Sequence, residues 1–106
     1  MTDAKIYWEG ESGKEYQYWI HPIGTDLRDE PGNYIYAKEV EPDQWMPIYI
    51  GQTSSLHDRL ASHEKEACAR RNGATHVHAH TTPGREEKRT SEEADLIAKW
   101  TPPCND

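Results

Sequence analysis

Hydrophobic and polar residues alternate along several stretches of the chain, the pattern of strands with one buried face. Aromatic-rich runs at Ile6–Glu9 and Tyr16–Ile20 flank a glycine-containing turn, which predicts a hairpin. Two more strands are predicted at 33–40 and 46–52, joined by a proline-containing turn, and a fifth at 74–81. The strands therefore lie mostly in the first half of the chain.

Helical spacing of apolar residues appears in two other segments. Segment 55–71 follows the N-cap candidates Thr53 and Ser54 and is predicted to form one continuous helix. Segment 85–100 is predicted to form a charged helix that two prolines bring to an end. Four strands, a helix, a strand and a helix predict an α+β domain with a small, mostly antiparallel sheet flanked by helices.

Composition limits the chain to one domain with a thin core. The 106 residues are 34% hydrophobic and include no phenylalanine, so the core must rely on tryptophan and tyrosine. No apolar run approaches the length of a membrane span, and the first residues lack the layout of a signal peptide, so we expect a soluble, cytoplasmic protein. Cys68 and Cys104 have no metal-binding spacing and are expected to be reduced packing residues.

Charge is distributed unevenly along the chain. The net charge of −7 argues against nucleic acid as a partner, because phosphate binding needs a positive surface. However, residues 1–45 carry ten acidic and four basic side chains, whereas residues 46–106 carry nine and eight. The acidity therefore lies mainly upstream, and the second half remains compatible with a phosphate-containing partner.

Three tyrosines are predicted to share one face of the sheet. Alternation puts Tyr34 and Tyr36 on the same side of their strand, and pairing through the turn opposes Tyr49 to one of them. Tyrosine is also a favoured strand residue, so simple packing is an equally ordinary explanation. The opposite side is predicted to carry the three isoleucines Ile35, Ile48 and Ile50.

An arginine and a histidine lie on the side of the predicted helix 55–71 that is expected to face the sheet. His63 falls inside its apolar stripe, and Arg59 lies to one side of that stripe. Taken singly, Arg59 could extend toward solvent and His63 could be a hydrogen-bonded, half-buried residue. Both together at the sheet-facing edge favour a polar site. The stripe consists of Leu56, Leu60 and Ala67.

A carboxylate is predicted on the inner face of the last helix. Glu93 has the spacing of the apolar residues there, whereas Glu92 and Asp95 point elsewhere. As an alternative, Thr90 and Glu93 have capping-box spacing and could close a helix start. An inward carboxylate needs a cation, for which the candidates are Arg59, Arg89 or a bound metal. The apolar residues on this face are Leu96, Ile97 and Trp100.

Three histidines alternate along the predicted strand 74–81. His76, His78 and His80 share one face, with Val77 and Ala79 on the other. Three ligands from one strand make a poor metal cage without a fourth group, so a hydrogen-bonded or solvent-facing row is favoured over a metal site. The sequence has no recognisable serine or cysteine nucleophile and no glycine-rich phosphate loop.

Several separated motifs between residues 31 and 105 resemble the GIY-YIG nuclease domain. "GNY" at 32–34 and "YIG" at 49–51 match the two signatures, with Asn33 in place of isoleucine. The motif "YIGQTSSLHDRLASH" places Arg59 and His63 at the family's helix positions, although Gln52 stands where the excision-repair subunit has lysine. "EADLIAKWTPPCN" is similar to the terminal pattern, which supplies Glu93 and Asn105.

The resemblance implies a GIY-YIG-like domain over residues 31–106, with residues 1–30 as an added N-terminal β-hairpin packed on it. It implies a metal-dependent endonuclease that hydrolyses phosphodiester bonds in DNA, including branched or nicked DNA. Glu93 would be the single protein ligand of Mg²⁺ or Mn²⁺. Tyr34 would be the general base and Arg59 the transition-state stabiliser.

The remaining roles implied by the resemblance are supporting ones. Tyr49 would orient water or phosphate, His63 would assist Tyr34, and Asn105 would anchor the end of the chain. The acidic charge predicts that a protein partner supplies DNA affinity or that the substrate is a special DNA structure. The alternative is a catalytically weak or inactive module that binds a protein or nucleic-acid partner, with the N-terminal hairpin as the contact surface.

Overall fold

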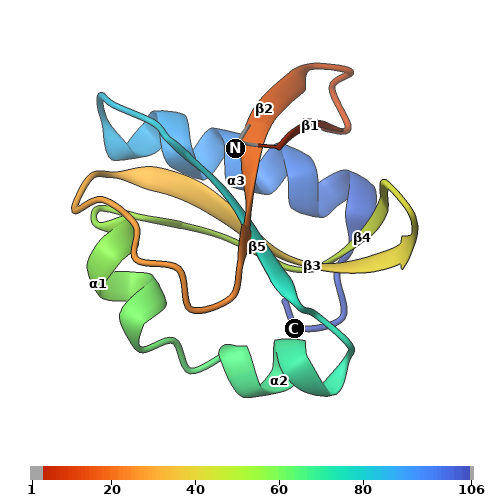
Figure 1. Ribbon diagram of the computed structural model, residues 1–106. Coiled ribbons are helices and arrows are strands. Elements are labelled where there is room, and N and C mark those ends of the chain that lie inside the picture. The colour runs from red at the N-terminus through yellow and green to blue at the C-terminus, as the bar shows by residue number, and fades with distance from the viewer. Residues whose placement is uncertain (1–3, 106) are drawn as a thin grey trace.

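The computed structural model describes residues 4–105 as a five-stranded antiparallel sheet with helices on both faces (Figure 1). The strand order is β1-β2-β5-β3-β4, and every pair of neighbours is antiparallel. The predicted α+β class is confirmed. The strands are β1 (Lys5–Glu9), β2 (Glu15–Pro22), β3 (Gly32–Glu41), β4 (Gln44–Thr53) and β5 (His76–Thr81).

The helices divide the core into two layers. Helices α1 (Leu56–Ala61) and α2 (Glu66–Arg71) lie together on one side of the sheet, and α3 (Glu86–Trp100) lies on the other (Figure 1). Tyr34 and Tyr36 pack with residues of α1 and α2, whereas Ile35 and Ile50 pack with α3. We call these two sides the tyrosine face and the α3 face.

The pairing of β3 with β4 confirms the expected tyrosine arrangement. Tyr36 lies opposite Tyr49, and Tyr34 lies opposite Gly51. A Cβ on Gly51 would come within 2.6 Å of the Tyr34 hydroxyl, so the glycine makes room for that ring. The isoleucine prediction is wrong at one position, because a register shift after Tyr36 turns Ile48 toward the tyrosine face.

The prediction of one continuous helix over 55–71 is wrong, since the chain leaves helical conformation after Ala61. Ser62 is extended, and the His63 Nδ1 accepts a hydrogen bond from the backbone N–H of Lys65. This local bond competes with helix continuation. The break also shifts the buried position, so that Ala69 is buried and the predicted Ala67 is exposed.

Cys68 and Cys104 form a disulfide, so the expectation of two reduced cysteines is wrong. The bond joins α2 to the segment after α3, and the two Cα atoms lie 6.1 Å apart. Their separation of 36 residues gave no local signal in the sequence. Only the packing of α2 beside the C-terminal segment brings them together.

The N-terminal hairpin is part of the same sheet. β1 pairs only with β2, and β2 continues onto β5 from Trp19 opposite Ala79 to Pro22 opposite His76. The division of the chain after residue 30 stays a prediction. Within residues 4–105, no helix has the length and apolarity needed to cross a membrane.

Candidate functional site

A buried hydrogen bond between a tyrosine and a histidine forms the centre of the tyrosine face. Tyr34 is 1% exposed, and its Oη lies 2.6 Å from Nε2 of His63, whose side chain is fully buried. Because Nδ1 accepts the Lys65 N–H, the proton of a neutral His63 is on Nε2. His63 therefore donates to Tyr34, and the tyrosine hydroxyl proton is directed elsewhere.

Burial sets the protonation of both groups. It lowers the pKa of His63 to about 4, with help from the nearby Arg59 charge, so the imidazole is neutral near pH 7. Burial also raises the pKa of Tyr34, whereas the Arg59 guanidinium acts in the opposite direction. The phenol is thus the resting form, and Arg59 is the group that favours its ionisation.

Arg59 is held in place by an acidic neighbour that sequence reasoning missed. Its Nη1 and Nη2 donate to the two carboxylate oxygens of Glu64 at 2.6 and 2.8 Å. The bidentate pair lowers the pKa of Glu64 to about 2. Glu64 follows the helix break, so helical spacing could not have identified it as a partner. It fixes the guanidinium but also offsets part of its charge.

Tyr49 completes the ring cluster at the edge strand. Its ring centroid is 5.2 Å from that of His63 and 6.2 Å from that of Tyr34. Burial raises the pKa of Tyr49, the Arg59 charge lowers it, and the Glu93 charge raises it further. The structure therefore brings Tyr34, Tyr49, Arg59 and His63 together, with Glu93 near enough to act on Tyr49.

Glu93 is a half-buried carboxylate without a partner. Burial raises its pKa, and no side chain in residues 4–105 hydrogen-bonds or ion-pairs with it. The predicted cations are engaged elsewhere, because Arg59 binds Glu64, and Arg89 donates to Gln52 and to the Gly84 carbonyl. The capping-box alternative is wrong, because α3 begins one turn earlier, at Glu86.

A hard divalent cation could be held here by a single carboxylate, that of Glu93. The described residues contain no group of three or more histidine, cysteine, aspartate or glutamate side chains that could hold a metal ion. Mg²⁺ does not need such a cage, because it keeps several waters and binds through one or two carboxylates and substrate phosphates. An unpaired Glu93 matches that mode of binding.

Asn105 ties the end of the chain to the edge strand. Its Oδ1 accepts the backbone N–H of Ile50, and its Nδ2 donates to the Ile50 carbonyl, both at 2.8 Å. The neighbouring Cys104 N–H donates to the Ile48 carbonyl. Asn105 thus binds the backbone of β4, and none of its hydrogen bonds reaches a tyrosine ring.

The prediction that Glu92 points away from the inner face of α3 is wrong, because its side chain is buried on the α3 face. It is 6% exposed, accepts the Tyr18 hydroxyl at 2.6 Å and contacts Nε2 of His80 at 2.7 Å. Asp95 likewise faces the hairpin, where it accepts hydrogen bonds from Ser12 and Tyr16. Both acids are therefore fully engaged, in contrast to Glu93.

The histidine row is hydrogen-bonded, as favoured from the sequence. His78 is completely buried and its Nδ1 accepts the indole N–H of Trp8 at 3.0 Å, which leaves its Nε2 without a partner. His80 contacts Glu92, and His76 contacts Thr75. Burial lowers the pKa of His78 to about 3. The row thus belongs to the packing of the α3 face.

The chain is similar to excinuclease cho of Shigella flexneri, with 30% identity over 63 residues. The matched part is 59% of this chain and 20% of that protein, so the chain spans about a fifth of its curated relative. No family model matches the chain, and no solved structure matches it. The likeness relates the chain, at a distance, to one part of an excinuclease.

Proposed function

We propose that this chain is a metal-dependent endonuclease domain that hydrolyses phosphodiester bonds in DNA. The observation that carries the proposal is the 2.6 Å contact of Tyr34 with His63 beside Arg59, together with the unpaired carboxylate of Glu93. Structural acids on the α3 face are hydrogen-bonded, and Glu93 is not. The distant likeness to an excinuclease supports the same activity.

Tyr34 acts as the general base in its ionised form. Water oxygen bonds to phosphorus, the water proton passes to the phenolate oxygen, and the ester P–O bond breaks toward a leaving oxygen that gains a proton from solvent. Burial disfavours the phenolate of Tyr34. Its formation therefore depends on the hydrogen bond from His63 Nε2–H and on the positive charge of Arg59. Tyr34 must therefore lose its own proton before it can accept one from water.

Arg59 neutralises charge on the phosphate during this step. Its guanidinium is oriented by Glu64, which leaves the charge close to Tyr34 and Tyr49. Tyr49 is less buried than Tyr34 and orients water or phosphate. Asn105 is a positioning residue, because it fixes Ile50 in the strand that carries Tyr49.

Glu93 would hold Mg²⁺ or Mn²⁺. When bound, such a cation polarises the scissile phosphate and stabilises developing negative charge. The carboxylate's own part is to supply one anionic oxygen from a half-buried position, where no side-chain cation among residues 4–105 competes for it. Because burial raises the pKa of Glu93, a proton competes with the cation at higher pH than for an exposed carboxylate, and affinity should fall on acidification.

The substrate is DNA that an acidic domain can hold through few phosphate contacts. A net charge of −7 disfavours long duplex, since duplex binding relies on many phosphate contacts. Branched or nicked DNA, or DNA delivered by a protein partner, needs fewer of them. This agrees with a site that presents one arginine rather than a basic surface.

A cleavage assay tests the proposal. Purified protein is incubated with supercoiled plasmid and with branched DNA, with Mg²⁺ or Mn²⁺ or with chelator, beside Glu93→Gln and Arg59→Ala. We expect metal-dependent nicking that both substitutions reduce by roughly 100-fold or more. Glu87→Gln, a change at an exposed acid of the same helix, should cleave normally. Cleavage by Glu93→Gln equal to that of Glu87→Gln would reject the site.

A second candidate is a binding module with weak or no catalysis. The burial of Tyr34 and the neutralising Arg59–Glu64 pair favour it, since both oppose phenolate formation at neutral pH. Glu64→Gln separates the two functions, because it frees the Arg59 charge. An increase in cleavage would support a nuclease that Glu64 restrains, and absence of cleavage on every substrate would favour the module.

A further inference from the structure

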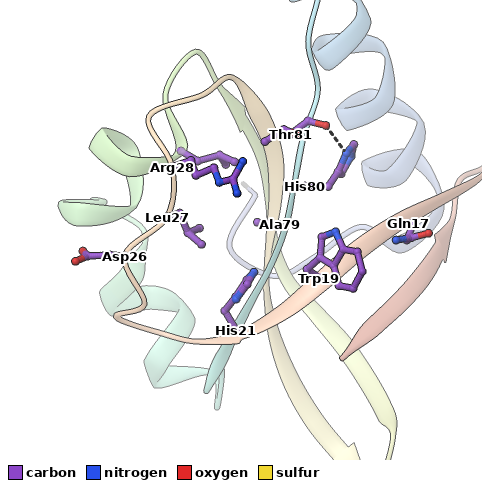
Figure 2. A pocket seen from close by; sticks show the side chains of 10 residues that line it. Gln17, Trp19, His21, Asp26, Leu27, Arg28, Ala79, His80 and Thr81 are labelled. Carbon is purple, nitrogen blue, oxygen red and sulfur yellow. Dashed lines mark hydrogen bonds between the residues drawn. The ribbon is translucent and has the colours of Figure 1, made fainter. Parts of the chain in front are cut away.

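A cavity of about 630 Å³ lies on the tyrosine face, away from the Tyr34–His63 contact. It is bounded by β2, β5 and the loop between β2 and β3 (Figure 2). Its volume lies within the range of small-ligand sites. Trp19, His21, Leu27 and Arg28 surround the hollow in Figure 2, whereas Asp26 points away from it.

The sheet opens at this place. β2 and β5 are paired only as far as Trp19 and Ala79, whereas β5 stays paired with β3 up to Thr81. Beyond Trp19, therefore, β2 separates from β5, and Gln17 and Thr81 border the gap. Amide and hydroxyl groups at such an opening can donate and accept hydrogen bonds.

Trp19 is the aromatic group of the cavity. It is 37% exposed, whereas Trp8 and Tyr18, two other large rings of β1 and β2, are 3% and 0% exposed. Trp19 lies beside Ala79, which lies beside Tyr34, so all three residues face the same side of the sheet. Two strand spacings separate Trp19 from Tyr34, roughly 10 Å, or about three nucleotides of a B-form strand.

Arg28 gives the cavity a positive group within an acidic protein. Its side chain is 83% exposed, and its contact with Glu30 is long, at 3.9 Å. The hollow thus combines an aromatic surface, an amide and a cation, while the one carboxylate among its lining residues points outward (Figure 2). Stacking, edge hydrogen bonds and phosphate contact are the three interactions that an unpaired nucleotide requires.

We infer that this cavity binds one unpaired nucleotide of the DNA substrate, with its base stacked on Trp19 and its phosphate near Arg28. The inference rests on the proposed nuclease function for its DNA substrate, and it narrows that substrate to DNA with a single-stranded nucleotide close to the cleaved bond. A single stacked base also explains how an acidic domain can bind a DNA strand, since stacking does not depend on a basic surface.

A binding experiment in chelator tests the inference independently of cleavage. The probe is a fluorescent single-stranded oligonucleotide of about 12 nucleotides, a length within known single-strand site sizes, titrated with the 106-residue chain and followed by anisotropy. Trp19→Ala should weaken binding by roughly 5- to 100-fold, Trp19→Phe by less, and Arg28→Ala should reduce the salt dependence. Met46→Ala and Arg71→Ala, changes at exposed residues outside the cavity, should bind normally.

An oligonucleotide of equal length with abasic sugars distinguishes stacking from charge, because it keeps the phosphates and lacks the bases. We expect it to bind weakly and equally to native protein and Trp19→Ala. Equal binding of abasic and normal strands by native protein would overturn the inference, as would unchanged binding by Trp19→Ala with a normal melting temperature. Trp19-dependent binding without any metal-dependent cleavage would reject the nuclease and keep the nucleotide site.

Discussion

The two faces of the sheet bury polar groups in different ways. On the α3 face, Tyr18, Glu92 and His80 satisfy one another, and Asn33 bonds to Thr82 and to the Arg89 carbonyl. On the tyrosine face, three rings gather around His63, and Glu93 of α3, whose charge reaches Tyr49, has no side-chain partner within residues 4–105. Satisfied networks stabilise a fold, whereas a cluster with shifted pKa values and a bare carboxylate is typical of chemistry.

The largest effect is expected on the rate of cleavage, when a buried tyrosine hydroxyl is removed from one face or the other. Tyr34→Phe and Tyr18→Phe each remove one buried hydroxyl with a 2.6 Å contact, one on each face. Both should lower the free energy of unfolding by about 1–3 kcal/mol, because a buried partner is left unpaired. Only Tyr34→Phe should also lower the cleavage rate, by roughly 100- to 10,000-fold.

Denaturant titration measures the stability of Tyr34→Phe and Tyr18→Phe, and the plasmid assay measures their cleavage rates. Cleavage that falls equally in both variants would contradict the division of roles between the faces. A Tyr34→Phe variant with full activity would remove the general base from the proposal.

The disulfide should give the next largest effect, and it acts on the tyrosine face. Its loop of 36 residues predicts that Cys68→Ala with Cys104→Ala lowers the free energy of unfolding by about 4 kcal/mol. Urea titration of native protein with and without reductant measures the same quantity. Since the double variant has no disulfide to reduce, its stability should not change with reductant.

Acid should destabilise both faces through their buried histidines. The pKa of His63 is lowered to about 4 and that of His78 to about 3, so the folded state binds protons more weakly than the unfolded chain. Stability should therefore fall as pH drops from 6.5 toward these values. At pH 5 each histidine should cost about 2 kcal/mol.

Single-residue variants show which histidine causes the free energy of unfolding to fall with pH. His78→Gln keeps an acceptor for Trp8 and should reduce the loss between pH 6.5 and 5 by up to about 1.4 kcal/mol per pH unit. His57→Gln, at a half-exposed position, should leave the loss in place. An unchanged pH slope in His78→Gln would show that this histidine is protonated in the folded state.

The smallest expected effect concerns the helix starts on the two faces. The Ser55 hydroxyl caps α1 by accepting the Asp58 N–H, whereas Arg85 at the start of α3 makes no side-chain cap. Ser55→Ala should cost about 1 kcal/mol, and Arg85→Ala should cost close to nothing. Thermal melting measures both, and equal losses would show that the Ser55 cap does not stabilise α1.

Strand alternation predicted the site better on the sheet than on the helices. Tyr34, Tyr36 and Tyr49 share a face because the two-residue period of a strand fixes side-chain direction. On α3 the same kind of argument placed Leu96 correctly and Glu92 wrongly. A helix face is wide, and long acidic side chains on it can turn toward a hydrogen-bond donor.

The break between α1 and α2 was not predictable from spacing. Apolar residues in 55–71 fit one helix, but His63 leaves it to meet Tyr34, and Glu64 turns to Arg59. These partners lie on other elements or across the break, so the local sequence pattern does not predict the contacts. Tertiary hydrogen bonds decided the local structure there.

The sequence by itself determined the class of fold, the order of its strands and the face that the three tyrosines share, because periodicity and turn residues act locally. Only the tertiary structure decided that Cys68 meets Cys104, that Glu92 is engaged while Glu93 is free, and that Trp19 borders a cavity. Each of these depends on which distant element lies opposite a side chain, and that follows from the packing of the whole chain.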